Sequence, residues 1–217
     1  MVVDAADDDA LVMDRRAFFR RGIERATRAT VQRANEWANQ RAGHWLRPPF
    51  ALDELEFLLG CTRCDACVEA CPHDALFRLP ARLGPQVAGT PGLDLLNKGC
   101  RLCEDWPCVA SCQPGALAFG SDTVEKGPAI ENAIDLQAPR PLAAIRIDQD
   151  RCLPYQGPEC GACAESCPVA GALLWASAKP SIDPKFCLGC GLCREACITD
   201  PPAITVSAID RSAAPAD

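Results

Sequence analysis

The chain has 217 residues, enough for one domain of ordinary size or two small ones. Sixteen residues are cysteine and only 6% are aromatic, so a large conventional core is not expected and something else must organise the interior. The net charge of −7 argues against nucleic acid as a partner.

The first predicted segment, residues 1–47, joins an acidic tip to an arginine-rich helix. Apolar residues recur at steps of three and four from Phe19 to Trp45, and no proline precedes Pro48, which predicts an amphipathic helix over 14–47 with Asp14 at its start. Residues 15–47 carry nine Arg and two Glu, a net charge of +7 that leaves −14 for the rest. The apolar stripe either packs on the chain's own acidic body or grips a partner protein. A membrane surface is disfavoured as its target because the stripe is rich in alanine.

The same segment bears on cellular location. Residues 15–21, RRAFFRR, resemble a twin-arginine export signal, but the residues that follow include Glu24, Arg25 and Arg28 instead of an apolar run. No stretch approaches the 18 or so apolar residues of a transmembrane helix. We therefore expect a cytoplasmic protein, in which clustered cysteines indicate metal or redox chemistry and not disulfides.

The cysteines fall into four groups of four. Groups one and four read CTRCDACVEACP and CLGCGLCREAC, group two has four residues in its middle gap, and group three has seven in its first gap. The groups are Cys61, Cys64, Cys67 and Cys71; Cys100, Cys103, Cys108 and Cys112; Cys152, Cys160, Cys163 and Cys167; and Cys187, Cys190, Cys193 and Cys197.

This spacing predicts four [4Fe–4S] clusters. In the run C-x₂-C-x₂-C-x₃-C the first three cysteines hold one cluster and the fourth ligates the cluster of a partner motif. Zinc sites more often use two CxxC pairs joined by a longer loop, and disulfides between such close cysteines would be strained. Gly161, Gly189 and Gly191 are expected to let backbone N–H groups approach the sulfurs, which raises the reduction potential.

Two pairings of the groups are open. Local pairing joins group one to two and three to four, whereas nested pairing joins one to four and two to three. The 19 residues between Cys167 and Cys187 favour local pairing of groups three and four. Local pairing assigns Cys61, Cys64, Cys67 and Cys112 to cluster 1; Cys100, Cys103, Cys108 and Cys71 to cluster 2; Cys152, Cys160, Cys163 and Cys197 to cluster 3; and Cys187, Cys190, Cys193 and Cys167 to cluster 4.

These features predict an α+β fold of two ferredoxin-like 2[4Fe–4S] units in tandem behind the N-terminal amphipathic helix. The predicted divisions are the 1–47 segment, a first unit at 48–120, a linker at 121–142, a second unit at 143–209 and a tail at 210–217.

Within the second unit, strands are predicted at 143–148 and 203–208, with a helix at 168–177 and a turn at 180–183 between them. The first unit is expected to repeat this plan more loosely. Pro72 and Pro168, each following the fourth cysteine of its group, are expected to open short helices.

Two stretches resemble a known family. Residues 47–71 and 152–168, with the CLPYQ start of group three as the most specific part, resemble NapF, the cytoplasmic ferredoxin-type protein of periplasmic nitrate reductase systems. The resemblance covers about 46–206. Group two, within 99–117, resembles instead the second motif of the exported MauM/NapG ferredoxin-type proteins, and RRAFFRR points the same way. The resemblance implies a role beside a molybdenum-dependent nitrate reductase.

No catalytic set, phosphate loop or dinucleotide fingerprint is recognisable, so we do not expect an enzyme. The first hypothesis is an electron-transfer protein that docks on a redox enzyme or its precursor, of the nitrate reductase type. The second is a cytoplasmic assembly factor for such a molybdoenzyme. The third, a structural adaptor, is disfavoured because one cluster would suffice to hold a small domain together.

Overall fold

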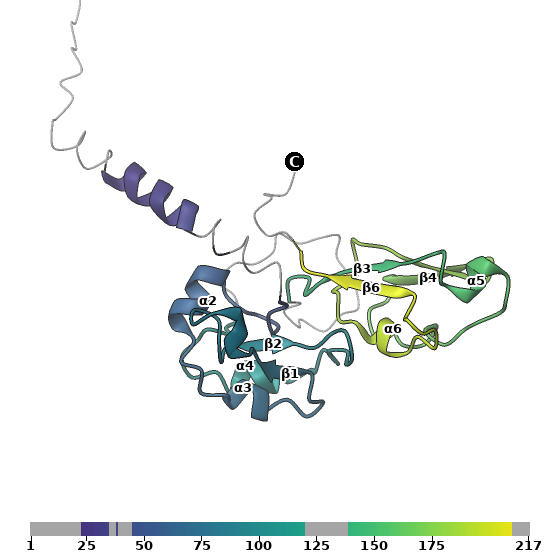
Figure 1. Ribbon diagram of the computed structural model, residues 1–217, viewed down its shortest axis with the longest axis horizontal. Coiled ribbons are helices and arrows are strands. Elements are labelled where there is room, and N and C mark those ends of the chain that lie inside the picture. Colours follow the sequence, from purple (N-terminus) through teal and green to yellow (C-terminus); the bar gives the residue numbers. More distant parts are fainter. Residues whose placement is uncertain (1–22, 35–37, 39–44, 120–138, 210–217) are drawn as a thin grey trace, which may run out of the picture.

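The computed structural model describes residues 23–34, 38, 45–119 and 139–209. Residues 45–119 form a first unit and residues 139–209 a second, and the two lie side by side (Figure 1). The named elements are α2 (Glu54–Gly60), α3 (Ala66–Glu69), β1 (Leu76–Arg78), η1 (Ala81–Leu83), β2 (Pro91–Leu93), α4 (Pro107–Ala110), β3 (Ala144–Ile147), α5 (Leu153–Gln156), β4 (Leu173–Ala176), β5 (Lys179–Ile182), α6 (Leu192–Glu195) and β6 (Ile204–Ser207).

The second unit is closed by a strand pair formed from its two ends. β3 and β6 are antiparallel, with Ala144 opposite Ser207 and Ile147 opposite Ile204. Both strands were predicted, and both are confirmed. Ile145 and Ile204 are buried, so this pair presents one apolar face to the interior.

The helix predicted at 168–177 is wrong, because this stretch forms the first strand of a hairpin. β4 pairs antiparallel with β5, from Leu173 opposite Ile182 to Ala176 opposite Lys179. The turn residues Ser177 and Ala178 both have positive φ, 51° and 59°, as a two-residue type I′ hairpin turn requires. Neither residue type signals that turn, so the alanine-rich sequence resembled a helix instead.

The first unit repeats this plan with shorter pieces. β1 and β2 form the counterpart of the hairpin, and an isolated bridge between Ala51 and Leu117 stands where the second unit has its closing strands. Pro72 lies in a turn and Pro168 in irregular chain, so neither opens a helix as predicted. The short helices α3, α4 and α6 instead start before the third cysteine of their groups and end before the fourth.

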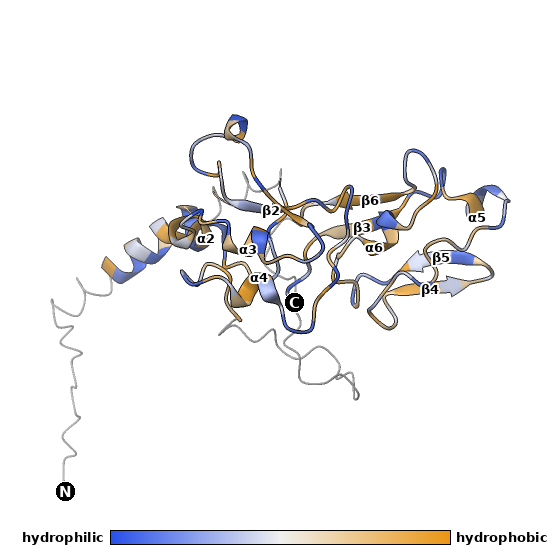
Figure 2. Ribbon diagram, turned by 90° about the horizontal axis from the view of Figure 1, so that it is seen from below, coloured by the Kyte–Doolittle hydropathy of each residue, from blue (hydrophilic) through white to orange (hydrophobic). Residues whose placement is uncertain are grey.

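The N-terminal segment differs from the prediction at its end. Residues 23–34 are helical, and residues 23–33 are exposed throughout, including Ile23 and Val31 at 66% and 55%. This helix extends away from the two units in Figure 1 and carries both apolar and polar residues in Figure 2. Asp14, Phe19 and Trp37 lie outside the described residues. Residues 45–47 are not helical but pack into the first unit.

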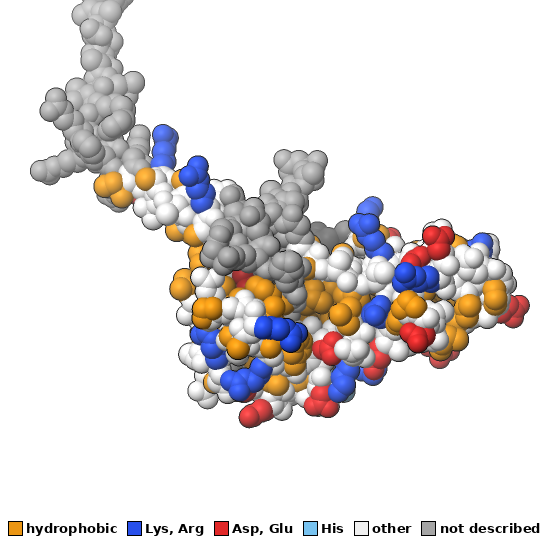
Figure 3. Space-filling model, viewed as in Figure 1, with side chains coloured by type: hydrophobic (Ala, Val, Ile, Leu, Met, Phe, Trp, Pro, Cys, Tyr) orange, Lys and Arg blue, Asp and Glu red, His pale blue; other side chains and the backbone are white. Residues whose placement is uncertain are grey.

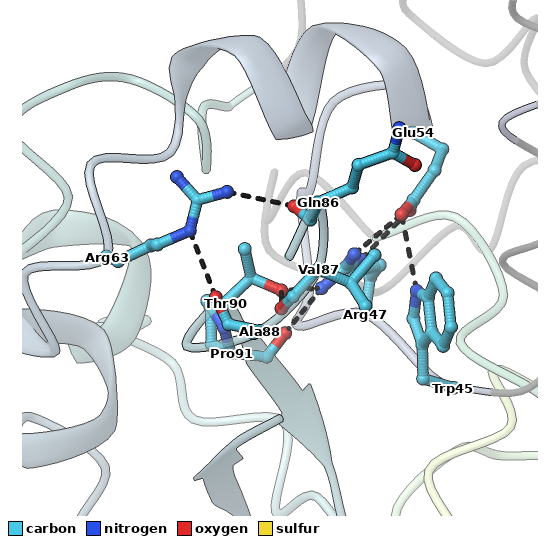
Figure 4. A network of polar contacts seen from close by, with 9 residues as sticks. All are labelled: Trp45, Arg47, Glu54, Arg63, Gln86, Val87, Ala88, Thr90 and Pro91. Carbon is cyan, nitrogen blue, oxygen red and sulfur yellow. Dashed lines mark hydrogen bonds and ion pairs between the residues drawn. The ribbon is translucent and has the colours of Figure 1, made fainter. Parts of the chain in front are cut away.

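The contacts of Arg47 explain why residues 45–47 are not helical. Its guanidinium is buried and grips Glu54 at both oxygens, with Nε–Oε2 at 2.9 Å and Nη2–Oε1 at 2.6 Å. Nη1 donates to the Thr90 hydroxyl at 2.8 Å and to the Pro91 carbonyl at 2.9 Å (Figure 4). The guanidinium carbon also lies 4.5 Å from the centre of the Phe57 ring. We call these contacts the Arg47 clamp; they connect residues 45–47 to α2 and β2.

The core is a single connected apolar cluster that runs through both units. Five of its buried members are cysteines, namely Cys67, Cys100, Cys108, Cys163 and Cys190. Leu142, predicted as the last linker residue, is also buried there, and its N–H donates to the Leu188 carbonyl at 2.8 Å. On the face shown in Figure 3, exposed apolar side chains lie among acidic and basic ones over both units. None of the helices within the described ranges combines the length and hydrophobicity that a bilayer-spanning segment requires.

Candidate metal centres

The sixteen cysteines line four separate cavities, four to each. We number the sites 1 to 4, each after the cysteine group that supplies three of its four thiols. Site 1 has Cys61, Cys64, Cys67 and Cys112; site 2 has Cys71, Cys100, Cys103 and Cys108; site 3 has Cys152, Cys160, Cys163 and Cys197; and site 4 has Cys167, Cys187, Cys190 and Cys193.

Each site therefore combines three cysteines of one group with the fourth of its neighbour. Cys71 leaves group one for site 2, and Cys112 of group two returns to site 1. The same exchange joins groups three and four through Cys167 and Cys197. Within the described residues the thiols come together in the local arrangement and not in the nested one.

The loops that carry the first three cysteines share a backbone pattern. The residue two positions after the first cysteine has positive φ in groups one, two and four, at Arg63 (60°), Leu102 (50°) and Gly189 (69°). A second left-handed residue opens the short helix that follows, at Asp65, Trp106 and Gly191. These two bends curl each loop around its cavity.

Glycine is needed for these bends in only one group. A Cβ on Gly189 would overlap the backbone of Ala143, so close packing as well as φ selects glycine there. Arg63 and Leu102 adopt the same φ without being glycine. Gly161, expected to act in the same way, does not have a positive φ, and a Cβ there would meet open space.

The insertions in groups two and three have structural roles. The two extra residues of group two bring Trp106 into the core, where it packs edge-to-face on Phe50 with ring centres 4.9 Å apart. The long gap of group three forms α5, and its Tyr155 hydroxyl donates to the Pro180 carbonyl of β5 at 2.9 Å. Both insertions fix a loop without displacing its cysteines from their site.

The arrangement and lining of the four sites fit an iron–sulfur cluster better than a single ion. A tetrahedral zinc site draws four ligands to about 2.0–2.3 Å from one ion. Among the described residues, no three His, Cys, Asp or Glu side chains converge closely enough for that. Apolar side chains such as Ile147, Leu173 and Leu117 make up most of the remaining lining. Polar residues also line three of the sites, namely Thr62, Arg63 and Asp65 at site 1, His73 and Arg101 at site 2, and Thr199 at site 3.

Comparison with known proteins supports the same chemistry. Residues 144–198 match the family described as 4Fe-4S dicluster domain, and residues 60–77 match the 4Fe-4S binding domain. The chain is 35% identical over 172 residues to the methylamine utilization ferredoxin-type protein MauM of Methylobacillus flagellatus, covering 74% of this chain and 67% of that protein. It is 31% identical over 162 residues to the ferredoxin-type protein NapF of Escherichia coli, covering 73% of this chain and 83% of that protein.

The chain belongs to the NapG/MauM/NapF family of ferredoxin-type proteins. It is also 33% identical over 183 residues to the ferredoxin-type protein NapG of Haemophilus influenzae, and it spans 78% of its own length but 61% of the length of that protein. The predicted resemblance to both NapF and MauM/NapG is confirmed. The 4Fe–4S character is confirmed for the motifs within residues 60–77 and 144–198.

The buried thiols of this ferredoxin-type chain are poor acids before iron binds. Burial raises the pKa of nine of the sixteen thiols, and neighbouring thiols of the same site add to the effect. The six largest shifts bring the pKa to about 12 for Cys67, Cys108 and Cys193, and to about 11 for Cys100, Cys163 and Cys190. Because iron binds thiolate, ligation must displace these protons.

Two cysteines have the opposite tendency. Cys64 is exposed, and the backbone N–H of Ala66 is the main cause of its lowered pKa. Burial alone would raise the pKa of Cys197, but hydrogen bonds from the hydroxyl and backbone of Thr199, together with the backbone of Ala203 and Ile204, outweigh it and lower the pKa. The Thr199 hydroxyl lies 3.3 Å from the Cys197 sulfur and accepts from the Ala203 N–H at 2.8 Å.

Thr199 and Leu117 are the site residues that sequence reasoning missed. The Leu117 N–H donates to the Cys112 sulfur at 3.3 Å, and the Thr199 hydroxyl shares a hydrogen bond with the Cys197 sulfur. The fourth cysteines of groups two and four therefore each have a hydrogen-bond partner in the chain that follows them. Such bonds raise the reduction potential of a cluster. The sequence does carry a signal for Thr199, because it is a threonine two residues after the fourth cysteine of its group. It carries none for Leu117, because the donor there is a backbone N–H.

Proposed function

We propose that this chain is an electron-transfer protein that carries four [4Fe–4S] clusters, one in each of sites 1 to 4, and exchanges electrons with a partner redox enzyme. The observation that supports it is the gathering of sixteen cysteines into four apolar cavities with four thiols each. A bound [4Fe–4S] cluster takes up and releases one electron at a time. The residues around it hold it, exclude water and set its potential.

The partner is a redox enzyme of one of two classes. The NapF-like stretches support a nitrate reductase of the molybdoenzyme type, either mature or as a precursor. The relatives named for methylamine utilization support an enzyme of that process as the alternative. We propose a protein without a substrate site of its own, working in the cytoplasm, where its thiols stay reduced.

The exposed N-terminal helix supports a dedicated partner over a freely diffusing carrier. Residues 23–33 present Ile23 and Val31 together with Arg25, Arg28 and Arg33 to solvent. An apolar and cationic helix of this kind suits an acidic groove on another protein. The same feature would serve an assembly factor that holds an immature molybdoenzyme, so the identity of the captured protein separates the two functions.

Iron and sulfide analysis tests the cofactor content. Four clusters of four iron and four sulfide ions give about sixteen of each per chain in anaerobically purified protein. The visible absorbance should bleach when dithionite is added. Zinc without sulfide would contradict the proposal. About eight iron ions per chain would mean that only two of the four sites hold a cluster.

Removal of residues 1–44 tests the partner. The cut stops before Trp45, because the Leu46 carbonyl accepts the Leu93 N–H at 2.8 Å and Arg47 forms the buried clamp. We expect the iron content to be unchanged and partner recovery in anaerobic pull-downs to fall to background. Replacing Arg25, Arg28 and Arg33 by Gln in the full chain is the matched control for charge alone.

The captured protein then decides between the functions. Recovery of a mature redox enzyme, which reoxidises the dithionite-reduced chain on addition of its own substrate, supports electron transfer. Recovery of a cofactor-free precursor alone would favour assembly. If the truncated chain recovers as much partner protein as the full chain does, the helix is not the docking element.

A further inference from the structure

The two units meet at a contact in which cysteines of different sites are directly hydrogen-bonded. The Cys100 N–H of site 2 donates to the Cys190 carbonyl of site 4, with nitrogen and oxygen 2.7 Å apart. Cys100 and Cys190 are both buried. The backbones of two ligand-bearing residues, one from each unit, thus touch inside the apolar core.

Glycine makes this approach possible. A Cβ on Gly99 would lie 2.8 Å from the backbone nitrogen of Leu192 and 2.5 Å from its Cδ2, closer than atoms pack without displacement. On the second unit's side of the contact, Gly191 lies against Leu95, and a Cβ on Gly191 would lie 3.3 Å from the Leu95 carbonyl oxygen. Leu95 and Leu192 are both almost fully buried, at 1% and 6% exposed. Water is therefore excluded from the contact.

Polar side chains of α6 hold the two units at this distance. Glu195 accepts from the Gly99 N–H at 2.8 Å and from Arg101 Nη2 at 3.0 Å. Its neighbour Arg194 donates from Nε to the Leu96 carbonyl at 3.0 Å and from Nη1 to the Ile204 carbonyl of β6. We call Arg194 and Glu195 the α6 clasp.

Within each unit the two sites adjoin through the chain itself. α3 carries Cys67 of site 1 and packs against α4, which carries Cys108 of site 2. In the second unit, Cys163 of site 3 and Cys167 of site 4 lie four positions apart in one loop. Sites 1 and 3 contribute no cysteine to the contact between the units.

We infer that the contact of residues 95–101 with residues 188–195 is the electron-transfer junction between the units, and that the four sites form one line in the order 1, 2, 4, 3. The inference rests on the proposed function, since it needs clusters in the sites. For each electron that crosses, site 2 is oxidised by one electron and site 4 is reduced by one, or the reverse. The contact makes one four-cluster conductor from what would otherwise be two separate two-cluster carriers.

Gly99→Ala tests the junction, with Gly60→Ala as the matched control. The new methyl at 99 must push the units apart, whereas a Cβ at 60 meets Ala116 at an ordinary 3.7 Å. Each dithionite-reduced cluster is paramagnetic, and neighbouring reduced clusters broaden and split each other's EPR signals. We expect the wild type and Gly60→Ala to show coupling between the units, and Gly99→Ala to lose it while retaining the coupling within each unit.

Iron content separates the outcomes. A wild type without clusters defeats the proposed function. A wild type with full iron whose reduced spectrum is the sum of two independent pairs defeats the junction and leaves the function standing. Full iron with unchanged inter-unit coupling in Gly99→Ala also overturns the inference. If Gly99→Ala loses iron, then Glu195→Ala, which opens the α6 clasp without adding bulk, decides by the same coupling measurement.

Discussion

Replacing Arg47 with methionine is expected to lower the free energy of unfolding of the first unit by about 3–5 kcal/mol, the usual cost of removing one partner of a buried ion pair. The substitution leaves the Glu54 carboxylate without a cation at a position that is 1% exposed. It also removes the donors to Thr90 and Pro91. Anaerobic guanidinium titration, followed by loss of the visible absorbance, measures the change.

Two further variants make this prediction specific. Lys98→Met breaks an exposed pair, Lys98–Asp74 at 3.4 Å, and should change stability by no more than about 1 kcal/mol. The double variant Arg47→Met with Glu54→Leu removes both charges and should recover most of the loss, because an apolar pair of similar volume carries no uncompensated charge. A single Arg47→Met variant as stable as Lys98→Met would show that the clamp does not hold the fold.

Replacing Cys71 with alanine is expected to remove the cluster of site 2, although Cys71 belongs to the first cysteine group. About four of sixteen iron should be lost, and the cluster of site 1 should remain. The reason is geometric, since Cys71 lines the cavity of Cys100, Cys103 and Cys108. EPR of the reduced protein identifies the missing signal.

Reference variants assign that signal. Cys103→Ala disables site 2 through its own group, and Cys64→Ala disables site 1. The spectrum of Cys71→Ala should match that of Cys103→Ala, and Cys112→Ala should match Cys64→Ala. The reverse correspondence would mean that each group keeps its own fourth cysteine.

The parts of the fold that were predictable are those set by local spacing. The grouping of the cysteines and the short path from Cys167 to Cys187 indicated local exchange, and the thiols do gather in those four sets. The strands at 143–148 and 203–208 alternate apolar and polar residues, which period-two reasoning detects. In each case the signal lies within a few residues of the feature.

The parts that were missed depend on contacts distant in sequence. Arg47 was counted with the arginines of the N-terminal helix, yet it is buried because Glu54 and Thr90 provide partners that no periodicity reveals. β4 was taken for a helix because Ala and Leu favour helices, but pairing with β5 overrides that preference. The contact between the units was invisible as well, since Gly99 and Leu192 are far apart along the chain.

The exposure of Cys64 has a consequence for handling the chain in air before its clusters are bound. Of the sixteen cysteines it alone is exposed, and its lowered pKa favours the thiolate, the form that peroxide attacks. Oxidative damage should therefore begin at the outer rim of site 1 and reach the buried sulfurs of Cys67 and Cys108 last.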